Sequence, residues 1–487
     1  MEVVVQPEEK AMILKTLKKF SRLEHPDPLF SPGLDPMVPM LLVAAAVGVI
    51  GSLAVELFRT AMYTIVRLYS SQEHLVAAAR SLPLLARVEV PAIAGFACGL
   101  AMWAGHRWIK RPRGPEYMEA VHVGDGVLPL GPNLIRTGSS LIGVSGGITI
   151  GREGTMIQFA SVASSLLGRI FHADESHRRL IVACGAAAGF AGAYHAPIAG
   201  TLFVAEIILG GLALREISAV LVAALISQLT TQAFFAAGPL YLAHAVPPVG
   251  FNDLFDAALV GLAAGLFGPV FLWLLHTSNK RYQALFTFLP VRMGVAGLAI
   301  GLLSVVQPEV WGNGFSVMQS FLSTHWALSA VAAVFLLRLI AVTLASAAGI
   351  PGGVLTPTLV TGAALGLLIG HTMLTPGADH SQTLWILVGA GSLLAATTHA
   401  PAMSAIMIFE TTHNYDVLLA ALPACVIASV VGSLLRHHSV YTEALGLGEH
   451  GPAASAAARR TIVPSSLPFH LRSSVVMAGD AEKTEAA

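Results

Sequence analysis

The sequence predicts an all-α integral membrane protein, and three observations lead to this fold class. Of the 487 residues, 55% are hydrophobic and only 11% are charged, whereas roughly 25% of the residues of an ordinary soluble domain are charged. The mean hydropathy is +0.71, and the apolar stretches are continuous, unlike the alternating strands of a membrane β-barrel. The third observation is an internal repeat.

The composition also excludes several classes of function. The 28 Lys and Arg residues balance the 28 Asp and Glu residues, which argues against nucleic-acid binding. Cys98, Cys184 and Cys425 lie far apart in apolar sequence, so they predict neither a disulfide framework nor a metal site. We expect no cofactor and no enzymatic activity. Because no ATP-binding motif is present, any transport would use an ion gradient.

The first segment, residues 1–36, is polar. Within it Ile13, Leu17, Phe20 and Leu23 recur at helical spacing, so we expect a short amphipathic helix on the cytoplasmic surface. The membrane domain follows over 37–445, with halves of roughly 37–245 and 250–445. The candidate spans are the apolar runs 37–55, 90–105, 217–243, 257–275 and 417–435.

Other apolar stretches are interrupted by Gly, Pro or single charges, namely 137–170, 179–214 and 339–378. They predict half-helices or re-entrant segments, which a membrane tolerates only where the backbone is buried or lines a cavity. Basic residues gather in the N-terminal segment, in the loop 106–117 and after the last span, which places both termini in the cytoplasm. We expect the Ala- and Ser-rich tail 446–487 to be disordered.

The repeat links residues 185–206, GAAAGFAGAYHAPIAGTLFVAE, with residues 389–410, GAGSLLAATTHAPAMSAIMIFE. Both copies contain His-Ala-Pro and end in Glu. Upstream, GREGT (151–155) and GVLTP (353–357) correspond at a similar offset. Matching broken segments in two halves are typical of transporters, whose ion sites lie near the midplane where half-helix ends converge.

The strongest candidate site is GREGT, where Arg152 and Glu153 interrupt apolar sequence. Ionisable residues at membrane depth are costly and usually functional. A helix beginning near Gly154 would present free N–H groups and its positive dipole end to an anion. A carboxylate can occupy that site itself and leave when it is protonated or displaced, so Glu153 is a candidate gate. The alternative is an Arg–Glu pair that only fixes a turn.

Two further segments are candidates for the same site. In GIPGGVLTP (349–357) the backbone amides of Val354 and Leu355 would be anion ligands, although a Gly-Pro kink in a span would give the same pattern. The phenol of Tyr441 is a neutral donor that suits a halide, although tyrosines are also common at membrane interfaces.

Taken in order, these motifs resemble the CLC family of chloride channels and chloride/proton exchangers over roughly residues 40–445. They are GREG with a following helix, G-x-x-x-P in the second half, the paired Ala-Pro segments and the late tyrosine. The bacterial ClcB-type branch is the most similar, through YMEA (117–120), VACGAAAG (182–189), WGNG (311–314) and LAATTHAP (394–401).

The resemblance implies a CLC-type fold, in which two inverted-topology repeats of tilted and broken helices meet at a midplane anion site. It implies a homodimer with one chloride pore per subunit in the bacterial inner membrane, and a tail without CBS domains. Glu153 matches the external gating glutamate, and Tyr441 matches the tyrosine that donates to chloride. Val354 and Leu355 match the chloride-binding amides, with Leu355 in place of the usual Phe, and Arg152 and Gly154 are further anion-binding candidates.

One departure from the family pattern concerns the anion. The family motif GSGIP places a serine at chloride, and the nearest stretch here, GDGVLP (124–129), has Asp125 in its place. An ionised carboxylate would repel chloride. Asp125 is therefore protonated, turned away as a helix N-cap or outside the pore, unless the alignment is shifted by one residue. We favour the N-cap.

The other departure concerns protons. Family exchangers carry a proton-loading glutamate directly after another glutamate, but LFVAEI (202–207) has Glu206 followed by Ile207. Isoleucine carries no proton, which favours a channel or a weakly coupled carrier. A fully coupled chloride/proton antiporter is the alternative, with Glu206 or Asp125 joining Glu153 on the proton path.

Several weaker signals have structural interpretations. We expect His195 and His399 to cap helices, Glu206 and Glu410 to satisfy backbone N–H groups or pair inside the bundle, and Arg338 to be a buried ion-pair partner.

A distant alternative comes from a different class of protein. GVSG (143–146) matches the GxSG of intramembrane serine proteases, which would make Ser145 a nucleophile.

Overall fold

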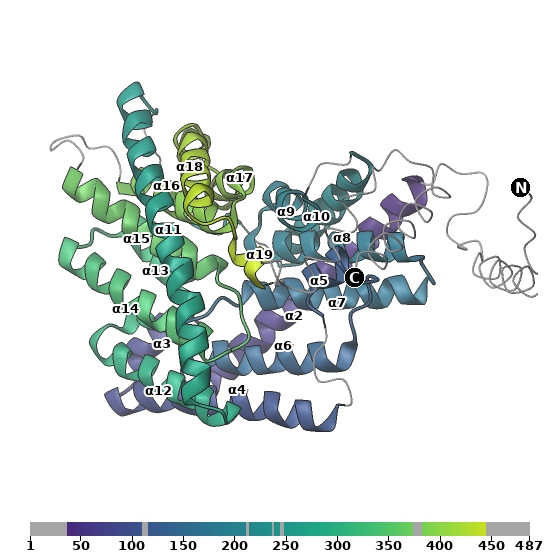
Figure 1. Ribbon diagram of the computed structural model, residues 1–487, viewed down its shortest axis with the longest axis horizontal. Coiled ribbons are helices and arrows are strands. Elements are labelled where there is room, and N and C mark those ends of the chain that lie inside the picture. Colours follow the sequence, from purple (N-terminus) through teal and green to yellow (C-terminus); the bar gives the residue numbers. More distant parts are fainter. Residues whose placement is uncertain are drawn as a thin grey trace, which may run out of the picture.

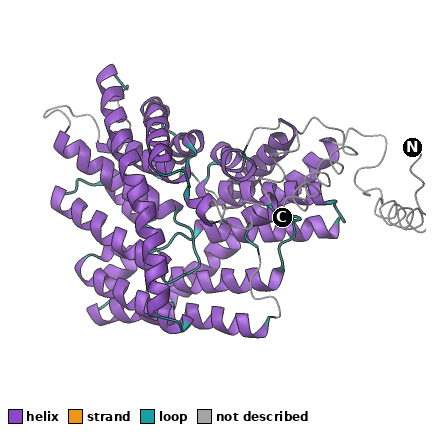
Figure 2. Cartoon of the chain, viewed as in Figure 1, coloured by secondary structure: helices purple, strands orange, loops and turns teal. Residues whose placement is uncertain are grey.

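The computed structural model describes residues 37–109, 115–210, 214–235, 238–243, 248–373 and 382–444. Over these ranges the chain is helical, and its β-type pairing is a single isolated bridge between Gly151 and Gly353 (Figure 2). The predicted all-α class is confirmed. The amphipathic helix expected within 1–36 and the tail 446–487 lie outside the described residues.

Within the described ranges, seven helices are long and apolar enough to cross a bilayer. They are α2 (Met37–Arg67), α4 (Leu84–Trp108), α10 (Leu214–Phe235), α11 (Phe251–Leu285), α12 (Leu289–Val306), α14 (Leu328–Ala347) and α18 (Tyr415–Leu435). Each candidate span falls in one of them, although the span predicted over 217–243 ends at Phe235. Two spans, α12 and α14, were missed because Arg292 and Arg338 interrupt their apolar runs.

The interrupted stretches are shorter helices, as predicted. Residues 137–170 contain the end of α6 (Leu130–Ser145) and α7 (Glu153–Ile170). Residues 179–214 contain most of α8 (Glu175–Tyr194), then α9 (Pro197–Phe203) and the π-helical η1 (Val204–Leu209). Residues 339–378 contain the end of α14 and α15 (Leu355–Met373), separated at the Gly-Pro segment. The remaining elements are α3 (Leu75–Ser81), α5 (Tyr117–His122), the 3-10 turn η2 (Pro308–Val310), α13 (Phe315–Ser323), α16 (Gln382–Thr398), α17 (Pro401–Thr412) and α19 (Val440–Ala444).

The two halves of the chain are built alike and lie side by side (Figure 1). α7 packs on α8 as α15 packs on α16, and α2 packs on α10 as α11 packs on α18. The two halves also share an unusual backbone conformation. The repeat-related residues His195 and His399 are both left-handed, with φ of 55° and 59°. His195 is the C-cap of α8 and His399 directly follows α16, so each ends a helix as expected, and a proline then begins the next one.

The repeat-related glutamates join the two halves by a reciprocal contact. The Glu410 carboxylate accepts the N–H groups of Ile198 and Ala199 at the start of α9, at 2.9 and 2.7 Å. The Glu206 carboxylate accepts the N–H of Met403 at the start of α17, at 3.0 Å. The first N–H groups of a helix have no intrahelical partner, so each glutamate satisfies groups of the other half. The expectation that these glutamates satisfy backbone N–H groups is confirmed.

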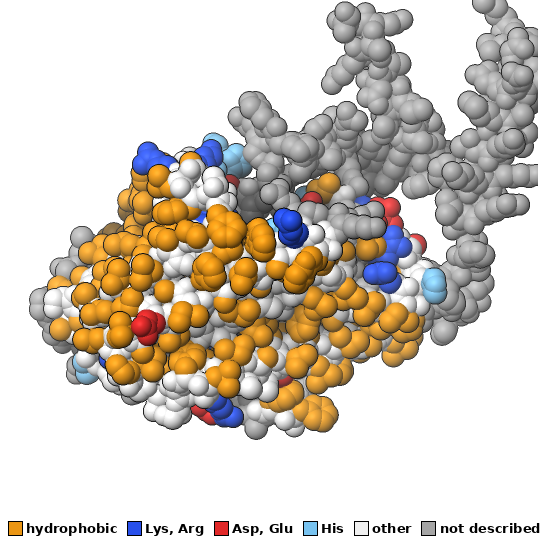
Figure 3. Space-filling model, turned by 90° about the horizontal axis from the view of Figure 1, so that it is seen from below, with side chains coloured by type: hydrophobic (Ala, Val, Ile, Leu, Met, Phe, Trp, Pro, Cys, Tyr) orange, Lys and Arg blue, Asp and Glu red, His pale blue; other side chains and the backbone are white. Residues whose placement is uncertain are grey.

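An apolar face covers the side of the molecule formed by α4 and α12 (Figure 3). Large hydrophobic side chains are exposed along both helices, including Ile93, Phe96, Leu100, Leu298 and Leu302. An exposed apolar surface of this extent suits contact with lipid rather than with water. The fold is thus a membrane-embedded bundle in which broken helices lie inside and long helices lie outside.

Candidate anion site

The two glycine-rich breaks predicted in the sequence meet in the structure. Gly151 and Gly353 donate their N–H groups to each other's carbonyl oxygens, both at 2.7 Å. A Cβ atom at Gly151 would lie 2.6 Å from the Gly353 oxygen, and one at Gly154 would lie 2.9 Å from the Gly353 Cα. Only glycine allows the two segments to approach this closely. The repeat aligns GREGT with GVLTP as corresponding segments, and the structure adds that these two segments are in contact.

The N-termini of two helices converge at this bridge. α7 begins at Glu153 and α15 begins at Leu355. The first N–H groups of each helix lack intrahelical partners, and each N-terminus carries a partial positive charge. Two such termini at one place form a site suited to an anion.

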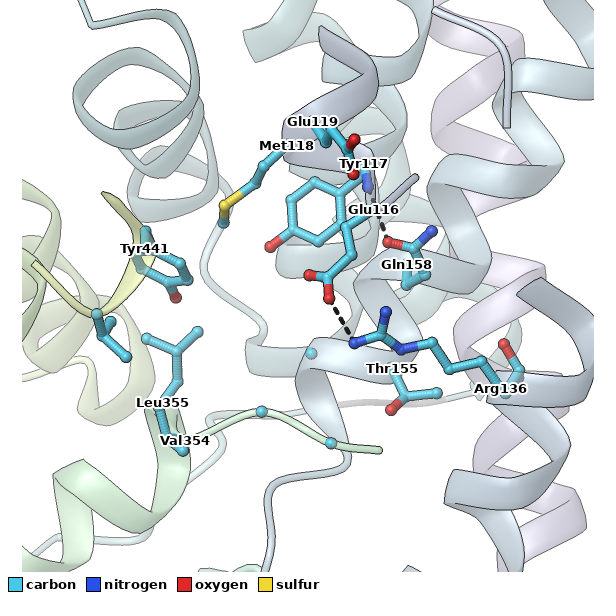
Figure 4. Close-up of a pocket in the computed structure, with 15 residues that line it drawn as sticks. Glu116, Tyr117, Met118, Glu119, Arg136, Thr155, Gln158, Val354, Leu355 and Tyr441 are labelled. Carbon is cyan, nitrogen blue, oxygen red and sulfur yellow. Dashed lines mark hydrogen bonds and ion pairs between the residues drawn. The ribbon is translucent and has the colours of Figure 1, made fainter. Parts of the chain in front are cut away.

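A cavity of about 370 Å³ adjoins both N-termini. Its lining includes Gly154, Val354, Leu355 and Tyr441, which come from α7, the second break, α15 and α19 (Figure 4). We call it the Tyr441 cavity. The structure therefore brings together four of the predicted anion-site residues. They come from parts of the sequence almost 300 residues apart.

Tyr441 is held in place by contacts on two sides. Its ring packs edge-on against Phe203, with centroids 5.8 Å apart. Two residues later, Glu443 forms ion pairs with His276 of α11 and, at 2.8 Å, with Arg436. The short helix α19 is thereby fixed beside the Tyr441 cavity.

The Tyr441 cavity also contains an ion pair that the sequence did not suggest. Glu116 accepts a hydrogen bond from Arg136 at 2.5 Å, and both side chains line the cavity (Figure 4). Beside them, the Gln158 side chain accepts the N–H of Tyr117 at 2.9 Å. Glu116 directly precedes the YMEA motif, but nothing in that motif indicates a contact with α6.

The Glu153 carboxylate lies at the edge of this cavity and faces away from it. The residue is 5% exposed. Its Oε1 accepts a hydrogen bond from Asn313 Nδ2 at 2.5 Å and lies 3.5 Å from Arg152 Nε. Arg152 and Asn313 line a second, much smaller pocket with Tyr63, Glu73 and His74, which we call the Asn313 pocket. Glu153 lines neither of the two, but in the chain it lies between Arg152, which lines the Asn313 pocket, and Gly154, which lines the Tyr441 cavity.

Several predicted residues lie elsewhere. Arg152 lines the Asn313 pocket rather than the Tyr441 cavity. Glu206 and Ile207 lie in η1, where Glu206 caps α17 and Ile207 packs against the main apolar core.

Asp125 requires a correction. Its side chain is exposed and accepts the N–H of Val127 at 3.1 Å. It is not a helix N-cap, because α6 begins at Leu130 with Pro129 in the capping position. The Asp side chain closes a local turn instead, and the residue lies outside the lining of the Tyr441 cavity. The segment that does line this cavity is Glu116–Glu119, a few residues earlier.

Arg338 also differs from the prediction. It is buried, but it donates to the backbone carbonyls of Glu309 (2.6 Å) and Gly312 (3.2 Å) rather than to a carboxylate. The Glu309 side chain pairs with Arg80. Arg338 therefore holds the loop that carries Asn313.

Ser145 lacks the surroundings of a nucleophile. It is fully buried at the end of α6, and its Oγ has no hydrogen-bond partner among the described residues. A serine hydrolase requires a base within hydrogen-bond reach.

Comparison with known proteins identifies the family. A family model described as "Voltage gated chloride channel" matches residues 96–433. The chain belongs to this family. A Ralstonia nicotianae protein named "Putative chloride channel protein ClcB-like" is 43% identical over 418 residues, covering 83% of this chain and 96% of the relative. The Salmonella typhi "Voltage-gated ClC-type chloride channel ClcB" is 41% identical, covering 84% and 99%. The resemblance to the ClcB-type branch is confirmed.

Solved structures of the CLC family have the same fold. A slow cyanobacterial Cl⁻/H⁺ antiporter superposes with a TM-score of 0.75 at 23% identity, covering 85% of this chain and 98% of that protein. A CLC-type fluoride/proton antiporter superposes with a TM-score of 0.69 at 19% identity, covering 83% and 97%. The predicted CLC-type fold with inverted repeats is confirmed.

Proposed function

We propose that this CLC-family protein transports chloride across the bacterial inner membrane, through one Glu153-gated pore in each subunit of a homodimer with cytoplasmic termini. The observation that carries the proposal is the convergence of α7 and α15 on a cavity that also holds Tyr441, with a buried carboxylate at its edge. The names of the relatives, which are chloride channels, support chloride as the substrate.

The site binds an anion with little fixed positive charge. Backbone N–H groups at Val354 and Leu355 and the phenol O–H of Tyr441 are neutral donors, and the helix dipoles add partial positive charge. Neutral donors hold a halide without trapping it, which rapid passage requires. The Glu153 carboxylate is itself an anion beside the same N-termini, so it competes with chloride and moves aside when it is protonated or displaced.

The absence of a proton-carrying side chain at Ile207 favours passive transport or weak coupling, and Ile207 packs in an apolar core. One observation favours the alternative, a fully coupled chloride/proton antiporter. The Glu116–Arg136 pair places a carboxylate on the Tyr441 cavity, and neither of these residues lines the Asn313 pocket. In that alternative, Glu116 takes the place of the missing proton carrier at Ile207.

Flux from proteoliposomes tests the proposal. The purified full chain should release chloride with a pH dependence that Glu153→Gln removes, while the matched control Ser145→Ala keeps it. Reversal potentials under a chloride gradient with a varied pH gradient then separate the mechanisms, because only a coupled carrier shifts with the pH gradient. Absence of chloride flux from correctly folded protein would refute the proposed function.

A further inference from the structure

The closed gate is in contact with a residue from the other half of the chain. Asn313 lies in the loop between η2 and α13, 160 positions away from Glu153, and its Nδ2 is 2.5 Å from Glu153 Oε1. Both residues are buried, with exposed fractions of 6% and 5%. The WGNG segment that contains Asn313 thus has a contact with the gate that its sequence does not reveal.

The Asn313 amide is held in one orientation. Its Oδ1 accepts the N–H of Phe315 at 3.2 Å, which leaves Nδ2 facing Glu153. The reverse orientation would place an amide oxygen against a carboxylate oxygen and would lose the bond to Phe315. The amide therefore acts as a hydrogen-bond donor to the gate.

The loop around Asn313 is anchored by backbone contacts. Gly312 and Gly314 flank it in left-handed conformations, with φ of 72° and 101°. The Gly312 N–H donates to the Gly147 carbonyl at 3.0 Å, and the Gly312 carbonyl accepts from the buried Arg338. Because the loop is fixed to both halves, opening of the gate requires Glu153 to leave Asn313 rather than the reverse.

We infer that Asn313 is a gate-positioning residue, which holds the ionised Glu153 carboxylate in the closed position and sets the pH at which the gate opens. This inference rests on the proposed gating role of Glu153. A hydrogen bond to an ionised carboxylate is roughly twice as strong as one between neutral groups, so Asn313 favours the ionised, closed gate over the protonated one. Loss of the donor should allow the gate to open at higher pH.

Other groups around Glu153 remain in place when Asn313 is changed. Arg152 Nε lies 3.5 Å from Glu153 Oε1. Arg59, which pairs with Glu56 at 2.5 Å, also attracts the Glu153 carboxylate electrostatically. The remaining ionisable groups near it or on the adjoining pocket are Tyr63, Glu73, His74, Tyr194, Tyr241 and Arg338. Two arginines still favour the ionised carboxylate, so the pH dependence should move rather than vanish.

The test measures chloride efflux from proteoliposomes across a range of pH. Asn313→Ala removes the donor, and Asn313→Asp is isosteric, retains the acceptor for Phe315 and adds a second acid. For Asn313→Ala we expect the pH of half-maximal flux to rise by about one to two units, and for Asn313→Asp at least as far. Asn414→Ala is the matched control, because the Asn414 Oδ1 likewise accepts the N–H of the residue two positions later, Asp416. It should keep the wild-type pH profile.

Two further variants separate this inference from the proposed gate. Glu153→Gln should flatten the pH profile, and adding Asn313→Ala to it should change nothing more. A pH-dependent Glu153→Gln would refute the gate itself. If Glu153→Gln is flat but folded Asn313→Asp and Asn313→Ala keep the wild-type profile, the role of Asn313 is refuted. The isosteric variant decides the question if the alanine variant does not fold.

Discussion

The reciprocal contact of Glu206 and Glu410 predicts a similar loss of stability when either carboxylate is neutralised. In Glu410→Gln the N–H groups of Ile198 and Ala199 lose a charged acceptor, and in Glu206→Gln those of Met403 and Ala402 do. A hydrogen bond to a charged group contributes about 1.5–3 kcal/mol and one between neutral groups about 1 kcal/mol. A carboxylate at a helix N-terminus contributes a further 0.3–1 kcal/mol or so. We therefore expect Glu410→Gln and Glu206→Gln each to cost about 1–5 kcal/mol, since each carboxylate accepts two backbone N–H groups.

Thermal unfolding of the purified protein in detergent measures this loss. The melting temperature should fall by similar amounts in Glu410→Gln and Glu206→Gln, and not at all in Glu89→Gln, a control at an exposed position of α4. Because both glutamates have the same structural role, any effect on transport should appear in both variants. The reasoning is wrong if Glu206→Gln melts like the wild type and abolishes proton movement while Glu410→Gln is silent. That result would put Glu206 on the proton path.

Three other predictions test the site. Gly151→Ala should prevent folding or chloride flux, because the added Cβ would lie 2.6 Å from the Gly353 oxygen. Gly138→Ala is the control and should be tolerated, because no atom lies near its added Cβ. Expression and chloride flux are measured for both variants, and a functional Gly151→Ala would disprove the close approach. Tyr441→Phe should weaken chloride binding several-fold in calorimetry by removing one neutral donor, about 1 kcal/mol; unchanged affinity would remove the phenol from the site. Asp125→Ala should leave chloride flux unchanged, since the side chain is exposed, and reduced flux would return Asp125 to the ion path.

The sequence was sufficient to find the two broken segments and most of the residues that the structure gathers at the candidate anion site. A glycine pair around Arg152 and Glu153 and a Gly-Pro run before Leu355 stand out because apolar spans rarely contain such residues. The 204-residue repeat then predicted that the breaks correspond, and the structure added the Gly151–Gly353 bridge between them.

The sequence misled at Asp125 and Arg338 for a physical reason. The side chain of Asp125 satisfies its own turn, and Arg338 satisfies backbone carbonyls. Both contacts depend on backbone geometry rather than on residue type. A motif shows that a polar group is present but not which donor or acceptor it meets.

What the sequence by itself determined is the membrane class, the repeat, the helix breaks and the candidate gate Glu153. These follow from composition and from patterns within a few tens of residues, which local physical chemistry decides. Only the tertiary structure decided which residues meet the candidate gate and the cavity carboxylate, since Asn313 contacts Glu153 and Arg136 contacts Glu116. Such contacts join helices whose relative placement depends on the packing of the whole bundle, so no local pattern encodes them.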